Sequence, residues 1–320
     1  MDKFFKNLSL ASAALVFVSL AGIFVSLYNS SKPAIDEYGL KFITDSSWGG
    51  EVPIKKSQQE VSSTQEEIMD TAEDDEVPDF VKRHDASNET ETKIVYGGLI
   101  PIVGSVLSTL IAMVFALPIA MGIAIYLAEI APANIAAPVG VAIELLAAIP
   151  SIIFGMWGMF YFAPLIQEYF GGYQVSLLTA GLVLGIMILP FMAAITRDSM
   201  KTTPDVLKES AYAMGATKFE VIKDVIFPYS KAGIIGSIIL ALGRALGETM
   251  AVAFLIGSVF VMPQNITDPT ISITVAMANN FGEASGLTLG SLFYLSLILF
   301  VLSFGIISFA KFYFFRKAQQ

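Results

Sequence analysis

Six long runs of apolar residues constrain this chain more than any other feature, because each can cross the hydrocarbon core of a membrane. A helix needs about 20 apolar residues to span about 30 Å of hydrocarbon. Strands of a β-barrel would instead show short segments of alternating polarity. The fold class is therefore expected to be an all-α integral membrane protein with about six transmembrane helices. The runs lie at Leu8–Tyr28, Gly98–Ile130, Val139–Leu165, Val175–Ile195, Ala232–Val261 and Leu287–Phe315.

Composition removes several classes of function. Apolar residues make up 55% of the chain and charged residues only 15%, a balance that suits lipid better than a soluble core. There is no cysteine and only one histidine, so a thiolate nucleophile, a disulfide framework and paired histidine ligands are all excluded. No cofactor, metal ion or nucleic acid is expected to bind.

The placement of Lys and Arg predicts how the chain is oriented. Cations lie on the N-terminal tail at Lys3 and Lys6, on the connection at 201–231, and in a C-terminal tail at 316–320. With six spans these three segments share one side, which the positive-inside rule assigns to the cytoplasm. A signal peptide is the alternative for the first run, but the small-x-small motif that a cleavage site would need lies near the start of the apolar stretch and not after it. Residues 1–29 are therefore expected to be a tail and a retained helix.

An acidic segment lies between the first two runs and is expected outside. Residues 30–97 hold 16 Asp and Glu against 7 Lys and Arg, and 50–95 contain one aromatic side chain, Phe80. Such a composition buries little apolar surface, so 30–97 is expected to be a largely disordered external loop. A calcium or partner site at Glu73–Glu76 is the alternative, although no spacing there matches an EF-hand.

The connection at 201–231 is expected to form a helical hairpin on the cytoplasmic side. Thr203 and Pro204 predict a helix start, and Gly215 predicts its end. Thr217 and Glu220 have the spacing of a capping box that begins a second helix, which Pro228 is expected to stop. The pattern alone leaves two alternatives open: a hairpin resting on the membrane surface, or a docking element for a cytoplasmic partner.

The same hairpin resembles the EAA loop of bacterial ABC-importer permeases. The resemblance rests on Glu209-Ser210-Ala211, then Gly215 after three residues, then Val225-Ile226-Phe227-Pro228 after nine. In that family the loop docks in a groove of the ATPase subunit. The resemblance implies a MetI-like permease core of five helices at 98–315, with Glu209, Ala211, Gly215 and Pro228 at the coupling positions.

A second resemblance points to phosphate. Residues 242–251, which include Arg244-Ala245-Leu246-Gly247-Glu248-Thr249, are similar to a segment of phosphate-importer permeases. The segments 38–43, 98–101 and 149–151, with Trp48, resemble the PstC-type family in particular. This implies a substrate path that includes Arg244, Glu248 and Thr249.

Charges inside a membrane run also require a physical explanation. Arg244 and Glu248 are four residues apart, so a continuous helix would place them on one face. Charged side chains within a membrane face the bundle interior or a water-filled cavity. Two alternatives follow: a structural ion pair, or an arginine that binds phosphate through its planar donors while Glu248 accepts a hydrogen bond from protonated phosphate. For Glu144, a hydrogen bond at a subunit interface is the preferred expectation.

No phosphate loop of the form G-x-x-x-x-G-K-[ST] occurs, so the chain is not expected to be an enzyme that hydrolyses ATP. The favoured hypothesis is a permease subunit of an ATP-driven phosphate importer that works by alternating access. By resemblance, its partners are a homologous second permease, two ATPase subunits, an external phosphate-binding protein and the lipid bilayer. The alternatives are a permease for another oxyanion, a stand-alone secondary transporter, or a membrane scaffold.

Overall fold

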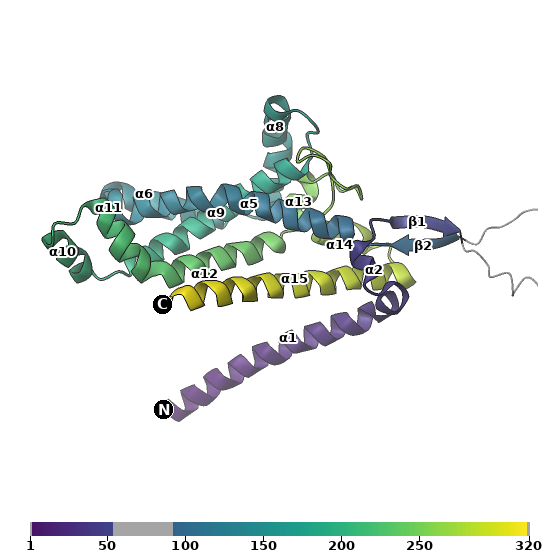
Figure 1. The fold of residues 1–320 in the computed structure, drawn as a ribbon, viewed down its shortest axis with the longest axis horizontal. Coiled ribbons are helices and arrows are strands. Elements are labelled where there is room, and N and C mark those ends of the chain that lie inside the picture. The colour runs from purple at the N-terminus through teal and green to yellow at the C-terminus, as the bar shows by residue number, and fades with distance from the viewer. Residues whose placement is uncertain (1, 54–91, 319–320) are drawn as a thin grey trace, which may run out of the picture.

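The computed structural model describes residues 2–53 and 92–318, which form one elongated helical bundle (Figure 1). Within these residues, five helices have the length and composition of a membrane span, and a bent helix pair would make a sixth. The prediction of about six transmembrane helices is confirmed. The five long helices are α1 (Asp2–Tyr38), α5 (Leu99–Ile125), α9 (Leu177–Lys201), α12 (Phe227–Leu246) and α15 (Gly286–Ala318).

The third predicted run is bent and not a single straight helix. Helix α6 (Ala133–Ala147) is followed by α7 (Ser151–Trp157), a π-helical turn at 158–162 and α8 (Ala163–Phe170), and the chain turns by 90° between α6 and α7. Pro150 lies at the break and explains it, because a proline disfavours helical backbone in the residue before it. The α8 end of this pair stands away from the bundle (Figure 1).

Close packing of α5 against α9 forms the centre of the bundle. Small residues lie at every fourth position of α5 and have no exposed surface: Ala112, Ala116, Ala120 and Ala124. On α9, a Cβ atom added to Gly185 would lie 3.1 Å from the carbonyl oxygen of Ala112. Small residues at such interfaces let two helix backbones approach closely. The buried face of α9 completes the core with Leu184, Met187, Ile188 and Met192.

The segment at 30–97 is more ordered at its ends than predicted. Helix α1 continues to Tyr38, α2 (Lys41–Thr44) follows, and β1 (Trp48–Pro53) pairs antiparallel with β2 (Thr92–Tyr96). The prediction of a largely disordered loop is therefore wrong for 30–53 and 92–97. The acidic cluster at 73–76 lies outside the described residues.

Aromatic contacts explain why the ends of this segment fold. The Trp48 ring stacks on Phe260 at 4.6 Å between centroids and meets the Tyr96 ring edge-on at 5.1 Å. Phe42 has no exposed surface and stacks on Tyr294 of α15 at 4.7 Å. Such aromatic pairs stabilise beyond the area that they bury. The two strands are thereby attached to the end of the bundle opposite both chain termini (Figure 1).

Candidate functional site: the coupling hairpin and the Arg244 region

The predicted hairpin is present and lies at the same end of the bundle as both termini (Figure 1). It consists of α10 (Asp205–Ala213), α11 (Lys218–Glu220) and the π-helical turn η3 (Val221–Ile226). Gly215 has a φ of +90°, a backbone conformation that favours glycine. The backbone N–H of Gly215 donates to the Tyr212 carbonyl and that of Ala216 to the Ala211 carbonyl. The predicted helix end at Gly215 is therefore confirmed.

The predicted capping box is confirmed as well. The backbone N–H of Thr217 donates to Glu220 Oε2 at 2.7 Å, and the N–H of Glu220 donates to Thr217 Oγ1 at 3.4 Å. These bonds satisfy two N–H groups that the first turn of a helix leaves without partners. The turn between α10 and α11 is thus fixed by its own side chains.

Two other predictions about this hairpin are wrong. Thr203 does not cap α10: the helix begins at Asp205, and Thr203 Oγ1 is a buried atom that makes no hydrogen bond to the described residues. Pro228 does not stop the second helix, because 218–246 form one continuous helical span. Pro228 therefore lies inside this span, where it donates no backbone hydrogen bond to the preceding turn. The π-helical η3 immediately precedes it, and such turns recur at functional sites.

The four expected coupling residues differ in exposure. Ala211 is 6% exposed and packs with Val221, Ile222 and Ile226 in a small apolar cluster beneath the hairpin. Glu209, Gly215 and Pro228 are exposed and accessible to a partner. Large apolar side chains beside them are also exposed: Val206 at 70%, Met214 at 83% and Phe219 at 72%. A water-facing surface seldom carries such a group without an interaction to cover it.

The expected substrate-path residues lie where the fifth apolar run breaks. Helix α12 ends at Leu246, and α13 (Met250–Leu255) begins after three residues. The prediction that Arg244 and Glu248 share one helical face is therefore wrong, since Glu248 lies beyond the end of α12. The break consists of Gly247-Glu248-Thr249, and the apolar residues that resume at Met250 make the run look like one continuous span.

Glu248 forms hydrogen bonds with α13 and with Thr274, and not with Arg244. Its Oε1 atom accepts the backbone N–H of Ala251 at 3.2 Å, in the first turn of α13. Its carbonyl oxygen accepts the Thr274 hydroxyl at 2.9 Å, which connects the break to α14 (Ile273–Asn280). A carboxylate at the start of a helix also interacts favourably with the helix dipole. Thr249, the third expected residue, donates its hydroxyl to the Gly247 carbonyl at 3.4 Å.

Arg244 is a half-buried cation that forms no ion pair with Glu248 or with any other residue that the structure describes. Its guanidinium carbon lies 5.7 Å from the centroid of the Phe191 ring on α9, within the range of a cation–π interaction. Within 2–53 and 92–318, no carboxylate or other acceptor forms an ion pair or hydrogen bond with this guanidinium. Sequence reasoning missed Phe191, which is 53 residues away from Arg244 in the chain.

Glu144 has its partner inside this chain. Its Oε1 atom accepts from Arg197 Nη2 of α9 at 2.8 Å, and Arg197 Nε also donates to Asp198 at 2.8 Å. Gly140 on α6 makes room for this arginine, because a Cβ atom there would lie 2.3 Å from Arg197 Nη1. The observed bond thus differs from the expected one across a subunit interface, and it attaches α6 to α9.

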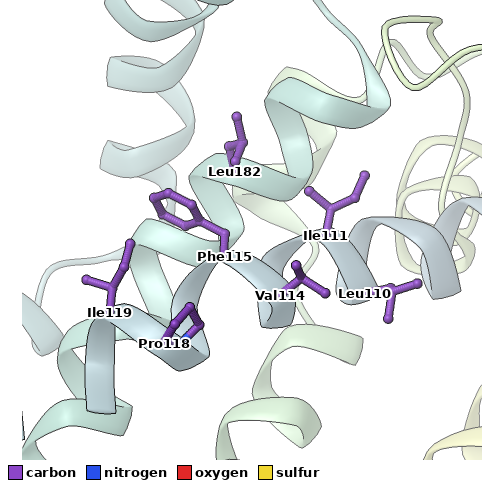
Figure 2. Close-up of a pocket in the computed structure, with 7 residues that line it drawn as sticks. All are labelled: Leu110, Ile111, Val114, Phe115, Pro118, Ile119 and Leu182. Carbon is purple, nitrogen blue, oxygen red and sulfur yellow. The ribbon is translucent and has the colours of Figure 1, made fainter. Parts of the chain in front are cut away.

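A groove of 530 Å³ on α5 and α9 is a poor candidate for an anion site. Figure 2 shows its lining, in which every side chain is apolar: Leu110, Ile111, Val114, Phe115, Pro118, Ile119 and Leu182. An anion would find no donor to replace its lost hydration there. The groove suits acyl chains or another apolar helix.

Comparison with known proteins places the chain in a class. The family model described as "Binding-protein-dependent transport system inner membrane component" matches residues 94–318. The MetNI methionine ABC transporter, in an inward-facing crystal form, shares the fold with a TM-score of 0.50 and 19% identity. That match covers 68% of this chain and 92% of the other. Fold and family model together define a multi-pass inner-membrane permease component, and they confirm the expected MetI-like core.

Full-length relatives narrow this class. The phosphate transport system permease protein PstC of Pasteurella multocida is 39% identical, over 97% of this chain and 91% of its own length. PstC of Haemophilus influenzae is also 39% identical, over 95% and 90%. The chain therefore belongs to the PstC family of permease proteins.

Proposed function

We propose that this chain is the permease subunit through which an ATP-driven importer moves inorganic phosphate across the cell membrane. The observation that carries the proposal is the Arg244 guanidinium, which lies in a membrane segment with no acidic partner in the described residues. An unpaired cation is costly in a membrane unless it faces the bundle interior or a water-filled path. A phosphate ion supplies the missing negative charge and fits the planar donors of arginine.

Glu248 and Thr249 have supporting roles in this proposal. Glu248 fixes the start of α13 through its Oε1 atom and its carbonyl oxygen, which sets the shape of the chain break next to Arg244. Its carboxylate retains acceptor capacity for a protonated phosphate oxygen. Sulfate carries no such proton at neutral pH, so this arrangement favours phosphate over sulfate. Thr249 lies between the two helices and contributes a hydroxyl to the same break.

The hairpin is the proposed docking element for ATP-driven motion. Glu209, Gly215 and Pro228 are exposed beside Val206, Met214 and Phe219, and Ala211 anchors α10 from beneath. ATP hydrolysis takes place on a separate ATPase chain. The proposed complex contains a homologous second permease, two ATPase subunits and an external phosphate-binding protein.

The domain assignment follows from the same proposal. Residues 98–315 are the permease core, and 1–29 are an N-terminal tail followed by a membrane helix. The hairpin at 201–231, the N-terminal tail and the tail at 316–320 lie in the cytoplasm. The strands β1 and β2 then lie outside, where the binding protein delivers phosphate. The support is that both termini and the hairpin lie at one end of the bundle (Figure 1).

Uptake of radiolabelled phosphate by cells that carry variants of this chain tests the proposal. Arg244→Gln removes the cation and should abolish uptake at unchanged membrane abundance. Gln174→Ala, which alters a polar residue of the loop before α9, is the control and should retain uptake. Normal uptake by Arg244→Gln would rule out the proposed role of this arginine.

A further inference from the structure

One ion pair ties the hairpin to a helix with which it shares no direct chain connection. Lys208 of α10 places its Nζ atom 2.8 Å from Oε1 of Glu129, in the π-helical turn η1 (Tyr126–Ile130) that continues α5. The two side chains are only 17% and 11% exposed. Lys208 also approaches Asp205 at 3.9 Å, but that carboxylate is 86% exposed and the interaction is correspondingly weak.

A solvent-exposed ion pair on the same hairpin differs from Lys208–Glu129 in each of these respects. Lys223 and Asp224 are adjacent in sequence, 3.8 Å apart, and 66% and 60% exposed. An exposed pair of this kind contributes little, because water and salt screen it and because ordering the side chains costs entropy. Removing one partner of a largely buried pair instead leaves a charge without compensation. Of these two pairs, only Lys208–Glu129 can hold the hairpin in a fixed relation to α5.

Helix α5 reaches from this ion pair to the opposite end of the bundle. Leu99–Ile130 form one continuous span of 32 residues, roughly 48 Å at the rise of an α-helix. Near the far end, Ser105 Oγ accepts the backbone N–H of Ile273 at 2.8 Å. Gly104 lies against the same segment, since a Cβ atom there would be 2.1 Å from the carbonyl oxygen of Ile271.

The segment that α5 contacts there connects to the proposed phosphate site. Ile273 begins α14, and the hydroxyl of Thr274 donates to the carbonyl oxygen of Glu248. Beneath the hairpin, Ala211 of α10 and Ala124 of α5 belong to one buried cluster, so the ion pair is reinforced by apolar packing. A displacement of α10 therefore acts on α5 directly, besides acting on α9 and α12 through the chain.

We propose that Lys208 and Glu129 are positioning residues that pass motion of the hairpin to α5 and thereby to the segment around Glu248. The inference rests on the proposed role of the hairpin as the element that docks the ATPase. The pair touches neither phosphate nor ATP. Its loss should leave the complex assembled but reduce the phosphate transported for each ATP hydrolysed.

The test uses the whole importer, purified and reconstituted in lipid vesicles with its ATPase and binding protein. Lys208→Gln and Glu129→Gln each remove one charge, and the exchange Lys208→Glu with Glu129→Lys restores a pair of opposite sign. Lys223→Gln is the matched control, because it removes a lysine from the exposed pair of the same hairpin. Three quantities are measured: the ATPase that copurifies, the ATP hydrolysed, and the phosphate transported.

Each single variant should copurify with normal ATPase and transport about five- to tenfold less phosphate per ATP, a range typical of coupling between two sites. The exchange should recover transport to within about threefold of the original protein, since the exposed Asp205 repels the new Glu only weakly. Normal transport per ATP in the single variants, or an exchange that recovers nothing, would overturn the proposal. Failure of the original chain to copurify with an ATPase would instead refute the docking role of the hairpin.

Discussion

Replacement of Gly215 by valine tests the hairpin through its backbone. Gly215 is exposed, and no atom lies within 4 Å of the position that a Cβ atom would take, so valine would meet no steric obstacle from its neighbours. Its φ of +90° is the obstacle, because L-residues rarely adopt positive φ and β-branched residues least of all. The expected cost is about 1–3 kcal/mol.

A cost of this size shifts the population of the correctly closed hairpin by roughly 5- to 150-fold. Because the turn is distant from the membrane core, the variant should still insert at normal abundance. Phosphate uptake and copurification with the ATPase should both fall. Gly215→Asn is the matched control, since asparagine tolerates positive φ better than other side chains and should retain most uptake. Normal uptake and copurification in Gly215→Val would refute the reasoning.

Three further predictions concern other parts of the chain. Deleting Ser57–Glu91 while keeping both strands should leave a protein that inserts and unfolds at nearly the original temperature in detergent; loss of the inserted protein would mean that this segment supports the fold. Phe191→Leu removes the ring beside Arg244 and should weaken phosphate uptake about two- to fivefold. Phe191→Tyr retains the ring face and should leave uptake unchanged. Equal uptake by the two variants would argue against the cation–π contact. Hydrogen bonds from Ser47, mainly from its side chain, lower the pKa of Asp45 below its usual value of 3.8, so the stability that this carboxylate contributes is present above that value and lost as pH falls through the folded-state pKa. Asp45→Asn should therefore reduce the acid sensitivity of thermal unfolding below about pH 4. An unchanged profile of unfolding temperature against pH would contradict this assignment.

Features encoded by neighbouring residues were predictable from the sequence. The membrane spans follow from continuous apolar composition, and the turn at Gly215 and the capping box at Thr217 each depend on residues within a few positions. The prediction that Thr203 caps α10 was wrong because the helix begins at Asp205, one residue later than expected, which leaves Pro204 and not Thr203 at the N-cap position. Local patterns give helix ends only to within a few residues.

Features encoded by distant residues were not predictable. The strands β1 and β2 contain little to mark them as a pair, since 38 residues separate Pro53 from Thr92 and the Trp48 ring of β1 stacks on Phe260 elsewhere in the chain. The break at 247–249 was missed because its polar residues are few and an apolar stretch resumes at Met250, so the whole run was interpreted as one helix. Glu129 and Lys208 are 79 residues apart, so only tertiary structure identifies them as partners.

The central claim is that the Arg244 guanidinium binds phosphate on its way through the membrane. Initial rates of radiolabelled phosphate uptake by Arg244→Lys, at matched membrane abundance, test it most directly. Lysine keeps the charge but loses the planar fork of donors, so a site that binds phosphate through two parallel hydrogen bonds should lose at least about tenfold in uptake. Excess unlabelled sulfate should compete no better against the variant than against the original protein. Uptake by Arg244→Lys at the original rate would contradict the claim, because Arg244 would then supply positive charge alone.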